Sequence, residues 1–329
     1  MAPDRSLSWF EKRKTILMFY RVFVFLLPLL VYGGIKPYDI RPDHYHDTTV
    51  GKIRILDQKE LSYRKVDKRS FSEISDLAYD TKSQNLYMIG DEGSLFTFKA
   101  VFGEKITTLD PFRGEMIRKG NGKPFKPWKR DSEGLAFGSK GGLLISFEGD
   151  AKLGLFDYEG TRIRQYALPQ KLSEKKNYRS ANKSLEALAL HPQYGALMVS
   201  EWPLKKDHKK LQTIYSLSGR EWHFRAEPES RSAVTAIETM DDGSVLLIER
   251  SFISLLHPLT ITLKKVDLRG CQNKLCHTET LVKMSTAEGW SIDNFEGLAK
   301  VGKHRYIMVS DDNDNFMQKT LLVYFEVIE

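Results

Sequence analysis

Several short motifs that identify enzyme families are missing from this 329-residue sequence. It contains no G-x-S-x-G nucleophile elbow, no P-loop, no H-E-x-x-H zinc motif and no glycine-rich dinucleotide fingerprint after a strand. Stretches with the 3.6-residue periodicity of amphipathic helices are scarce, which argues against a helical solenoid. No Pro/Gly/Ser-rich linker divides the chain, so one large domain is the simplest organisation.

Cysteine is nearly absent, since Cys271 and Cys276 are the only two. They lie in a polar stretch where an oxidising compartment would allow a small disulfide loop. A zinc site needs more ligands, and only His277 lies nearby. We therefore favour a disulfide over a zinc site, with two free thiols as the third alternative.

The charge balance is basic, with a formal net charge of +7 from 50 basic and 43 acidic residues. This surplus favours anionic partners, and an anionic small molecule is the ligand or substrate that we expect. No segment interleaves aromatic residues with a basic face, as a nucleic-acid module would. We therefore expect no nucleic-acid binding.

The N-terminus resembles a targeting segment rather than part of the fold. Lys12, Arg13 and Lys14 are followed by apolar residues 15–20 and, after Arg21, by the apolar run 22–32. A charged region followed by an apolar region is typical of a signal peptide. Arg21 shortens the uninterrupted run below the ~20 residues of a membrane helix, which disfavours a retained anchor, but no A-x-A-like cleavage site follows.

These features predict that residues 1–36 are a signal peptide or membrane anchor and that residues 37–329 form an exported domain. The domain would be periplasmic or secreted. A retained anchor would tether it to the inner membrane.

Five copies of one motif fill the chain from residue 74 onward, each a strand, a tight turn and a second strand. Self-similarity at a period of roughly 50 to 60 residues marks a repeat architecture. The copies begin at Ile74, Ser132, Leu185, Val234 and Phe295. Two further strands are expected after each of the first four copies, at residues 94–99 and 105–109, 154–158 and 162–168, 212–217 and 221–226, and 261–268 and 280–283. Four strands per repeat predict an all-β fold, a β-propeller.

The last copy retains only one further strand, residues 320–327. The extended segment 52–65 near the N-terminus would complete that blade and close the ring, which removes exposed strand edges. The sequence thus favours five four-stranded blades. A sixth, degenerate blade between Glu249 and Glu296 is the alternative.

Acidic residues recur at both ends of the motif. Alignment on the apolar residues places one column at the start of the first strand, at Ser75, Glu133, Glu186, Thr235 and Glu296. A second column ends the second strand, at Asp91, Glu148, Glu201, Glu249 and Asp311. Because a short turn makes the two strands antiparallel, both columns meet at one end of the hairpin. In a propeller this end lies at the mouth of the central channel.

Carboxylates gathered in this way need a cation or basic partners to stay ionised, and hard oxygen ligands suit Ca²⁺. We expect the metal ligands to be Glu133, Glu186, Glu249, Asp311 and Asp312. Glu148 or Glu296 would accept a proton from water, and Arg250 would hold an anionic group together with lysines of the flanking loops. Alternatively, the acids only accept hydrogen bonds from neighbouring blades.

The strings D-S-E-G-L at residues 131–135, L-I-E-R at 247–250, N-F-E-G-L at 294–298 and S-D-D-N at 310–313 resemble a known family. This is the phytase-like domain of bacterial proteins described as "esterase-like activity of phytase". The similarity spans residues 71–329 and implies an exported β-propeller that hydrolyses esters or phosphoesters. The chain departs from the pattern at Ser75-Asp76 and at Thr235, where other copies carry a glutamate.

Two functions follow as hypotheses. The first is a Ca²⁺-assisted hydrolase of phosphate or carboxylate esters. The second is a cell-envelope propeller that binds an anionic ligand or a partner without catalysis. A purely structural propeller, whose acids join blades, is the third interpretation.

Overall fold

A computed structural model describes residues 34–180, 183–254 and 256–328. The chain from Ile35 to Glu329 forms one compact unit. The predicted export segment, residues 1–36, lies outside the described residues except for its last three. Within the described ranges, no helix has the length and apolar character that crossing a bilayer requires.

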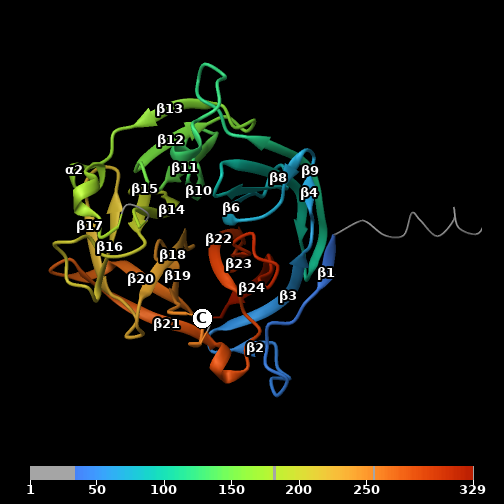
Figure 1. Ribbon diagram of the computed structural model, residues 1–329. Coiled ribbons are helices and arrows are strands. Elements are labelled where there is room, and N and C mark those ends of the chain that lie inside the picture. The colour runs from blue at the N-terminus through green and yellow to red at the C-terminus, as the bar shows by residue number, and fades with distance from the viewer. Residues whose placement is uncertain (1–33, 181–182, 255, 329) are drawn as a thin grey trace, which may run out of the picture. The chain divides into compact units, whose positions relative to one another are not determined.

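The unit is a β-propeller of antiparallel four-stranded sheets set around a ring (Figure 1). Blade one contains β6 (Ile74–Asp80), β7 (Asn85–Gly90), β8 (Ser94–Phe102) and β9 (Ile106–Met116). Blade two contains β10 (Ser132–Phe137), β11 (Leu143–Phe147), β12 (Lys152–Phe156) and β13 (Arg162–Tyr166). Blade three contains β14 (Leu185–His191), β15 (Gly195–Ser200), β16 (Leu211–Ser216) and β17 (Glu221–Arg225). Blade four contains β18 (Ser232–Thr239), β19 (Val245–Ser251), β20 (Thr260–Gln272) and β21 (Leu275–Ser285).

Blade five joins the two ends of the unit, as predicted. It contains β22 (Asn294–Gly302), β23 (Arg305–Asp311), β24 (Leu321–Val327) and β3 (Ile53–Leu61), and β3 pairs antiparallel with β24. Two short strands, β1 (Ile35–Pro37) and β2 (Thr49–Val50), pair with the edge of β3 that faces away from β24. The long spacing between Glu249 and Glu296 is taken up by β20 and β21, of 13 and 11 residues, so the described residues form five blades.

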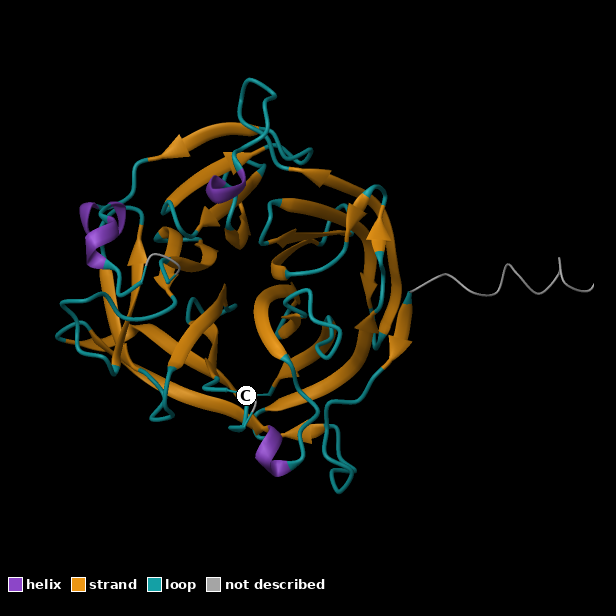
Figure 2. Cartoon of the chain, in the orientation of Figure 1, coloured by secondary structure: helices purple, strands orange, loops and turns teal. Residues whose placement is uncertain are grey.

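The remaining elements lie between or beside the blades (Figure 2). They are the β4 (Lys65–Val66) and β5 (Arg69–Ser70) hairpin, the short helix α2 (Gln170–Ser173), and the 3-10 turns η1 (Pro127–Lys129), η2 (Lys175–Asn177) and η3 (Thr286–Glu288). The predicted disulfide between Cys271 and Cys276 is present and closes the β20–β21 hairpin. A single parallel pair, His223 with Leu275, joins blades three and four.

Each blade is held to the next by an apolar layer. Between blades one and two, Phe147 and Phe156 are fully buried against Ile89 and Leu95. Between blades five and one, Tyr324 and Leu322 pack with residues that include Phe96 and Phe98. Because burial of one large apolar side chain contributes about 1.5–3 kcal/mol, these layers supply most of the stabilisation of the ring.

The innermost strands, β6, β10, β14, β18 and β22, contact one another in ring order. Small residues allow this approach, because a Cβ added to Gly297 would lie 2.6 Å from Val309 Cγ1 and 2.9 Å from Asp76 Cα. A Cβ on Gly134 would lie 2.6 Å from Leu188 Cβ. The glycine that follows the glutamate in both E-G-L strings is therefore needed for packing around the axis.

Asp76 occupies the corresponding position in blade one and joins three blades. Its buried carboxylate accepts hydrogen bonds from the backbone N–H of Leu77 (2.8 Å), of Leu135 in blade two (2.7 Å) and of Leu298 in blade five (3.1 Å). Burial raises the pKa of Asp76 well above its ordinary value. The interpretation that acids join neighbouring blades therefore holds for Asp76, although Asp76 belongs to neither of the two acidic columns.

The close packing of the inner strands leads to a stability prediction. Gly297→Ala should reduce the free energy of unfolding by about 1–3 kcal/mol, because the added methyl group overpacks the contact with Val309 and the backbone of Asp76. Gly103→Ala is the matched control, since its Cβ would meet only Lys105 O at 3.8 Å. Urea unfolding of both variants measures the difference, and equal stability of the two would contradict this account.

Candidate functional site

A β-bulge interrupts the first strand of every blade at the first acidic column. The strand register shifts between Ile74 and Asp76, and the corresponding shift recurs in β10, β14, β18 and β22. The residues at the bulges are Ser75, Glu133 with Gly134, Glu186, Thr235 and Glu296. A bulge re-aims a side chain, so each of these side chains departs from the usual alternation of the strand.

The strand register corrects the second acidic column in blade four. Asp311 lies opposite Asn294 in blade five, and the residue in the same place in blade four is Arg250, opposite Ala233. Glu249 instead lies opposite Val234. Because successive side chains of a strand point to opposite faces, this shift of one residue turns Glu249 away from the column and turns Arg250 into it. The alignment of Glu249 with Asp91, Glu148, Glu201 and Asp311 was therefore wrong.

Glu249 has a complete set of partners of its own. Its Oε1 lies 2.8 Å from Lys264 Nζ, and its Oε2 accepts hydrogen bonds from the Glu227 N–H (2.6 Å) and the Ser232 hydroxyl (2.7 Å). Only 2% of Glu249 is exposed. These contacts anchor the loop between β17 and β18.

Asp312, another expected metal ligand, also anchors a loop. Its carboxylate accepts hydrogen bonds from the Glu73 N–H at 2.9 Å, the Asp314 N–H at 3.2 Å and the Thr320 hydroxyl at 3.1 Å. Asp312 therefore connects the β23–β24 loop to the segment that leads into blade one.

Other carboxylates converge near the axis in two groups of three. The first group is Asp91, Asp131 and Glu133, and the second is Glu148, Glu186 and Glu201. In each group, one oxygen from every residue lies within 4.8 Å of the others. We call the second group the carboxylate trio. The structure thus adds Glu201, Asp91 and Asp131 to the expected site residues. The sequence signal that could have indicated Asp131 is its place in the D-S-E-G-L string. In the structure, the backbone carbonyl of Asp131 accepts a hydrogen bond from the Glu148 N–H.

Arg250 bridges the acids of blades three and five. Its Nη1 lies 2.6 Å from Glu296 Oε1 and also donates to Asn294 Oδ1, while Nη2 lies 3.1 Å from Glu201 Oε1. Asn294 Nδ2 donates to the same Glu296 oxygen at 2.8 Å. Both terminal nitrogens of Arg250 are therefore engaged by the protein, which fits a positioning role better than direct binding of a ligand.

Lys183 is a second cation at the cluster. Its Nζ lies 2.5 Å from Glu201 Oε2 and 5.8 Å from the centroid of the Trp202 ring. Asp311 is 5% exposed, and its Oδ1 accepts the Asn313 N–H at 2.7 Å. Arg250 and Lys183 together are too few to neutralise the acids around them.

The unbalanced charge changes the protonation of these acids. Burial raises the pKa of Asp91 to about 7 and that of Asp311 to about 9, and repulsion from neighbouring carboxylates contributes to both shifts. Burial raises the pKa of Glu148 to about 8 although Lys183 lowers it. The pKa values of Glu133 and Glu186 also lie well above their ordinary value for the same reasons. Several of these groups therefore carry protons at neutral pH when no cation is bound.

Glu148 also carries an unsatisfied acceptor. The residue is 7% exposed, and among the described residues its Oε1 has no hydrogen-bond partner. A buried carboxylate oxygen without a donor is costly, so a cation or a bound proton is the natural partner for it. Glu201 Oε2 and Glu229 Oε2 are also buried without a hydrogen bond, but their carboxylates form ion pairs with Lys183 and Lys283, whereas Glu148 forms no ion pair within the described residues.

Comparison with known protein families matches residues 69–314 to the phytase-like family, described as "esterase-like activity of phytase". The chain belongs to this family. The match confirms the resemblance seen in the D-S-E-G-L and N-F-E-G-L strings. No curated protein matches this phytase-like chain.

Two solved structures resemble the phytase-like propeller at low sequence identity. One is virginiamycin B lyase from Staphylococcus aureus, at 10% identity and a TM-score of 0.40, covering 89% of this chain and 100% of that one. Another is U3-55K, at 8% identity and a TM-score of 0.38, covering 83% of this chain and 98% of that one. Similarity at this level carries no argument about function.

The raised pKa values predict how the stability of the phytase-like domain depends on pH. The folded acids keep protons that the unfolded chain releases, so their stabilising contribution is present below the unfolded pKa and is lost as pH rises through about 7 to 9. In EDTA, the free energy of unfolding should fall between about pH 5.5 and 8.5 by at least ~1.4 kcal/mol, the equivalent of one pKa unit. Urea unfolding at a series of pH values measures this change in the free energy of unfolding. Glu148→Gln should flatten the fall, and a rise with pH would exclude this electrostatic description.

Loss of Arg250 should destabilise the domain in a pH-dependent way. Arg250→Gln removes the partner of Glu201 and Glu296, which should cost about 3–5 kcal/mol near pH 8. The cost should shrink near pH 5.5, because burial raises the pKa of Glu296 and this carboxyl group is then closer to neutral. Arg225→Gln, at the exposed last residue of β17, is the control and should change stability by less than about 0.5 kcal/mol. Equal losses at both pH values for Arg250→Gln would show that packing, not charge, is responsible.

Proposed function

We propose that this phytase-like propeller is a hydrolase of phosphate or carboxylate esters that works with a divalent cation at the carboxylate trio. The observation that carries the proposal is the buried Glu148 carboxylate: its Oε1 has no hydrogen-bond partner among the described residues, and one of its oxygens lies within 4.8 Å of oxygens from Glu186 and Glu201. Oxygen ligands alone favour a hard cation such as Ca²⁺, and waters or an anionic ligand would complete its coordination.

The three residues come from two blades, which fixes their spacing. Glu186 lies at the bulge of β14, while Glu148 and Glu201 follow the ends of β11 and β15. Because these positions lie on or next to paired strands, the trio is preorganised rather than assembled by a loop. When bound, the cation would polarise the ester and lower the pKa of a bound water.

Glu296 is the residue that we assign as general base. Arg250 and Asn294 both donate to its Oε1, so the carboxylate is oriented and its charge is supported. Its Oε2 has no hydrogen bond within the described part of the chain, and 13% of the side chain is exposed. That oxygen would accept the proton of an attacking water. Arg250 would act through Glu296 and Glu201 rather than on the substrate.

We also propose that the domain is exported. The charged and apolar pattern of residues 12–32 and the Cys271–Cys276 disulfide support this proposal, since both are typical of an oxidising compartment. A retained N-terminal segment would make the protein a membrane-tethered one of the cell envelope.

A second candidate function is capture of an anionic ligand without bond cleavage. The feature that favours it is a basic cavity between the loops of blades three and four, on the same face as the trio. Binding and hydrolysis differ in whether a product appears, so one set of variants separates them.

The test combines cation binding with turnover. Ca²⁺ at 100 times its Kd should stabilise the wild-type protein by about 2.7 kcal/mol relative to EDTA. A panel of chromogenic phosphate and acyl esters should show turnover that EDTA abolishes. The Glu148→Gln, Glu186→Gln double variant should lose both the thermal shift and the turnover, whereas the exposed control Glu104→Gln keeps both.

Three outcomes are informative. A calcium shift with no turnover on any ester would favour ligand capture. Turnover that survives both EDTA and the double variant would place the chemistry elsewhere. Absence of both shift and turnover in the wild-type protein would contradict the hydrolase and leave the acids as structural groups.

A further inference from the structure

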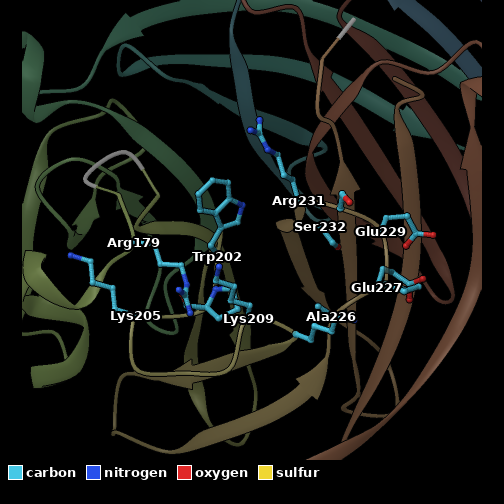
Figure 3. Close-up of a pocket in the computed structure, with 13 residues that line it drawn as sticks. Arg179, Trp202, Lys205, Lys209, Ala226, Glu227, Glu229, Arg231 and Ser232 are labelled. Atoms are coloured by element: carbon cyan, nitrogen blue, oxygen red, sulfur yellow. The ribbon is translucent and has the colours of Figure 1, made fainter. Parts of the chain in front are cut away.

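A cavity of about 780 Å³ opens between the loops of blades three and four (Figure 3). Its volume lies within the range that holds small organic ligands. One wall carries Trp202, Arg179 and Lys209, and the other carries Ala226, Glu227, Glu229 and Arg231. Both walls lie at the end of the blades where β15 and β17 finish, which is also the end that carries the carboxylate trio.

Hydrogen bonds that Arg179 donates hold the first wall in place. Its Nε donates to Pro203 O at 2.8 Å, and its Nη2 donates to Leu204 O at 3.1 Å and to Asp207 O at 2.8 Å. These are backbone carbonyls, so they hold the loop in place without cancelling the charge of the guanidinium. The wall therefore contributes a fixed positive charge beside Trp202.

The second wall is held by Glu249. This buried carboxylate accepts the Glu227 N–H and the Ser232 hydroxyl, one at each end of the loop that forms the wall. Ser230 lies in the same loop, and its carbonyl oxygen accepts a hydrogen bond of 2.6 Å from the Ser251 hydroxyl of β19. Glu249 is therefore a positioning residue for the cavity.

The cavity carries an excess of positive charge. Its two acids are already paired, Glu227 with Lys264 at 2.6 Å and Glu229 with Lys283. The basic side chains of Lys205, Lys209, Lys210 and Arg231 form no ion pair with a carboxylate of the described residues. An anion entering the cavity would meet these cations without displacing an existing partner.

The apolar part of the lining indicates what carries that anion. Trp202, Pro203, Ala226 and Pro228 offer flat or apolar surface, and Trp202 is half-buried. An aromatic face favours a ring or another apolar body, which a free inorganic ion lacks. Lys183 then links the cavity to the trio, since it lies near the Trp202 ring and pairs with Glu201.

We propose that this cavity is a binding subsite for an organic anion, a carboxylate or phosphate group attached to an aromatic or apolar body. The body would lie against Trp202 while Lys209 and Arg231 hold the charge. Binding here does not depend on catalysis. Its role as a substrate subsite rests on the proposed hydrolysis, because only then does the ligand extend past Lys183 to the trio.

The experiment uses the full chain in EDTA, with phenyl phosphate and benzoate as probes in calorimetric titrations. Both probes should bind, inorganic phosphate should bind at least tenfold more weakly, and neutral benzyl alcohol should not bind measurably. Trp202→Ala should weaken phenyl phosphate at least tenfold with little effect on inorganic phosphate. Lys209→Glu should weaken both anionic probes at least tenfold.

Lys206→Glu is the matched control, because it makes the same charge change in the same exposed loop without lining the cavity. It should change the affinity by less than threefold. Equal effects of Lys206→Glu and Lys209→Glu, or equal affinity for phenyl phosphate and inorganic phosphate, would overturn the proposal, since either indicates diffuse surface attraction.

The Glu148→Gln, Glu186→Gln double variant separates this proposal from the proposed function. Binding of phenyl phosphate should persist in that variant, even where ester turnover is absent in every form of the protein. Loss of probe binding in the folded double variant would overturn the proposal, because the probe would then be bound at the trio.

Discussion

Burial of many carboxyl groups around one axis is the constraint on which the rest of this structure depends. The bulges of the first strands and the ends of the second strands bring acids from neighbouring blades within a few ångströms of one another. Water cannot screen such a cluster well, so charge repulsion must be relieved by protonation, by basic side chains or by a cation. Arg250 and Lys183 relieve part of it, and Arg250 at the same time connects blades three, four and five.

The acids of the propeller fall into two kinds that differ in their partners. Asp76 and Glu238 are fully supplied by backbone N–H groups; Glu238 accepts from Thr239 at 2.5 Å and from Lys300 at 3.1 Å. Glu249 is supplied by Lys264 and two further donors. Glu148, by contrast, keeps a buried oxygen without a donor among the described residues. The satisfied acids stabilise the fold, and the unsatisfied oxygen of Glu148 is the basis of the proposed cation site.

The site and the cavity share their supports. Glu201 belongs to the trio and receives Arg250 and Lys183, while the next residue, Trp202, lines the cavity. Arg250 enters the cluster, and the preceding residue, Glu249, holds the other wall of the cavity. Glu249 and Arg250 are neighbours on β19 and point to opposite faces, while Glu201 and Trp202 are neighbours just beyond the end of β15, so each pair serves both features. The proposed cation site and the basic, aromatic-lined cavity lie on one face of the ring, an arrangement that suits the proposed ester substrate with an anionic group.

The sequence by itself determined the repeat, the four-stranded blades, the closing strand at residues 52–65 and the disulfide, because strand period, turn residues and cysteine spacing are local properties. It also predicted Glu186 as a metal ligand and Glu148 and Glu296 as proton acceptors, and these roles remain predictions. Only the tertiary structure decided the strand register. This register places Arg250 rather than Glu249 in the second acidic column and leaves Asp312 in the β23–β24 loop. The tertiary structure alone placed Asp131 beside Asp91 and Glu133, paired Glu201 with Arg250 and Lys183, and showed that Asp76 joins three blades. A bulge or a one-residue shift leaves composition and periodicity almost unchanged, yet it reverses the face to which a side chain points.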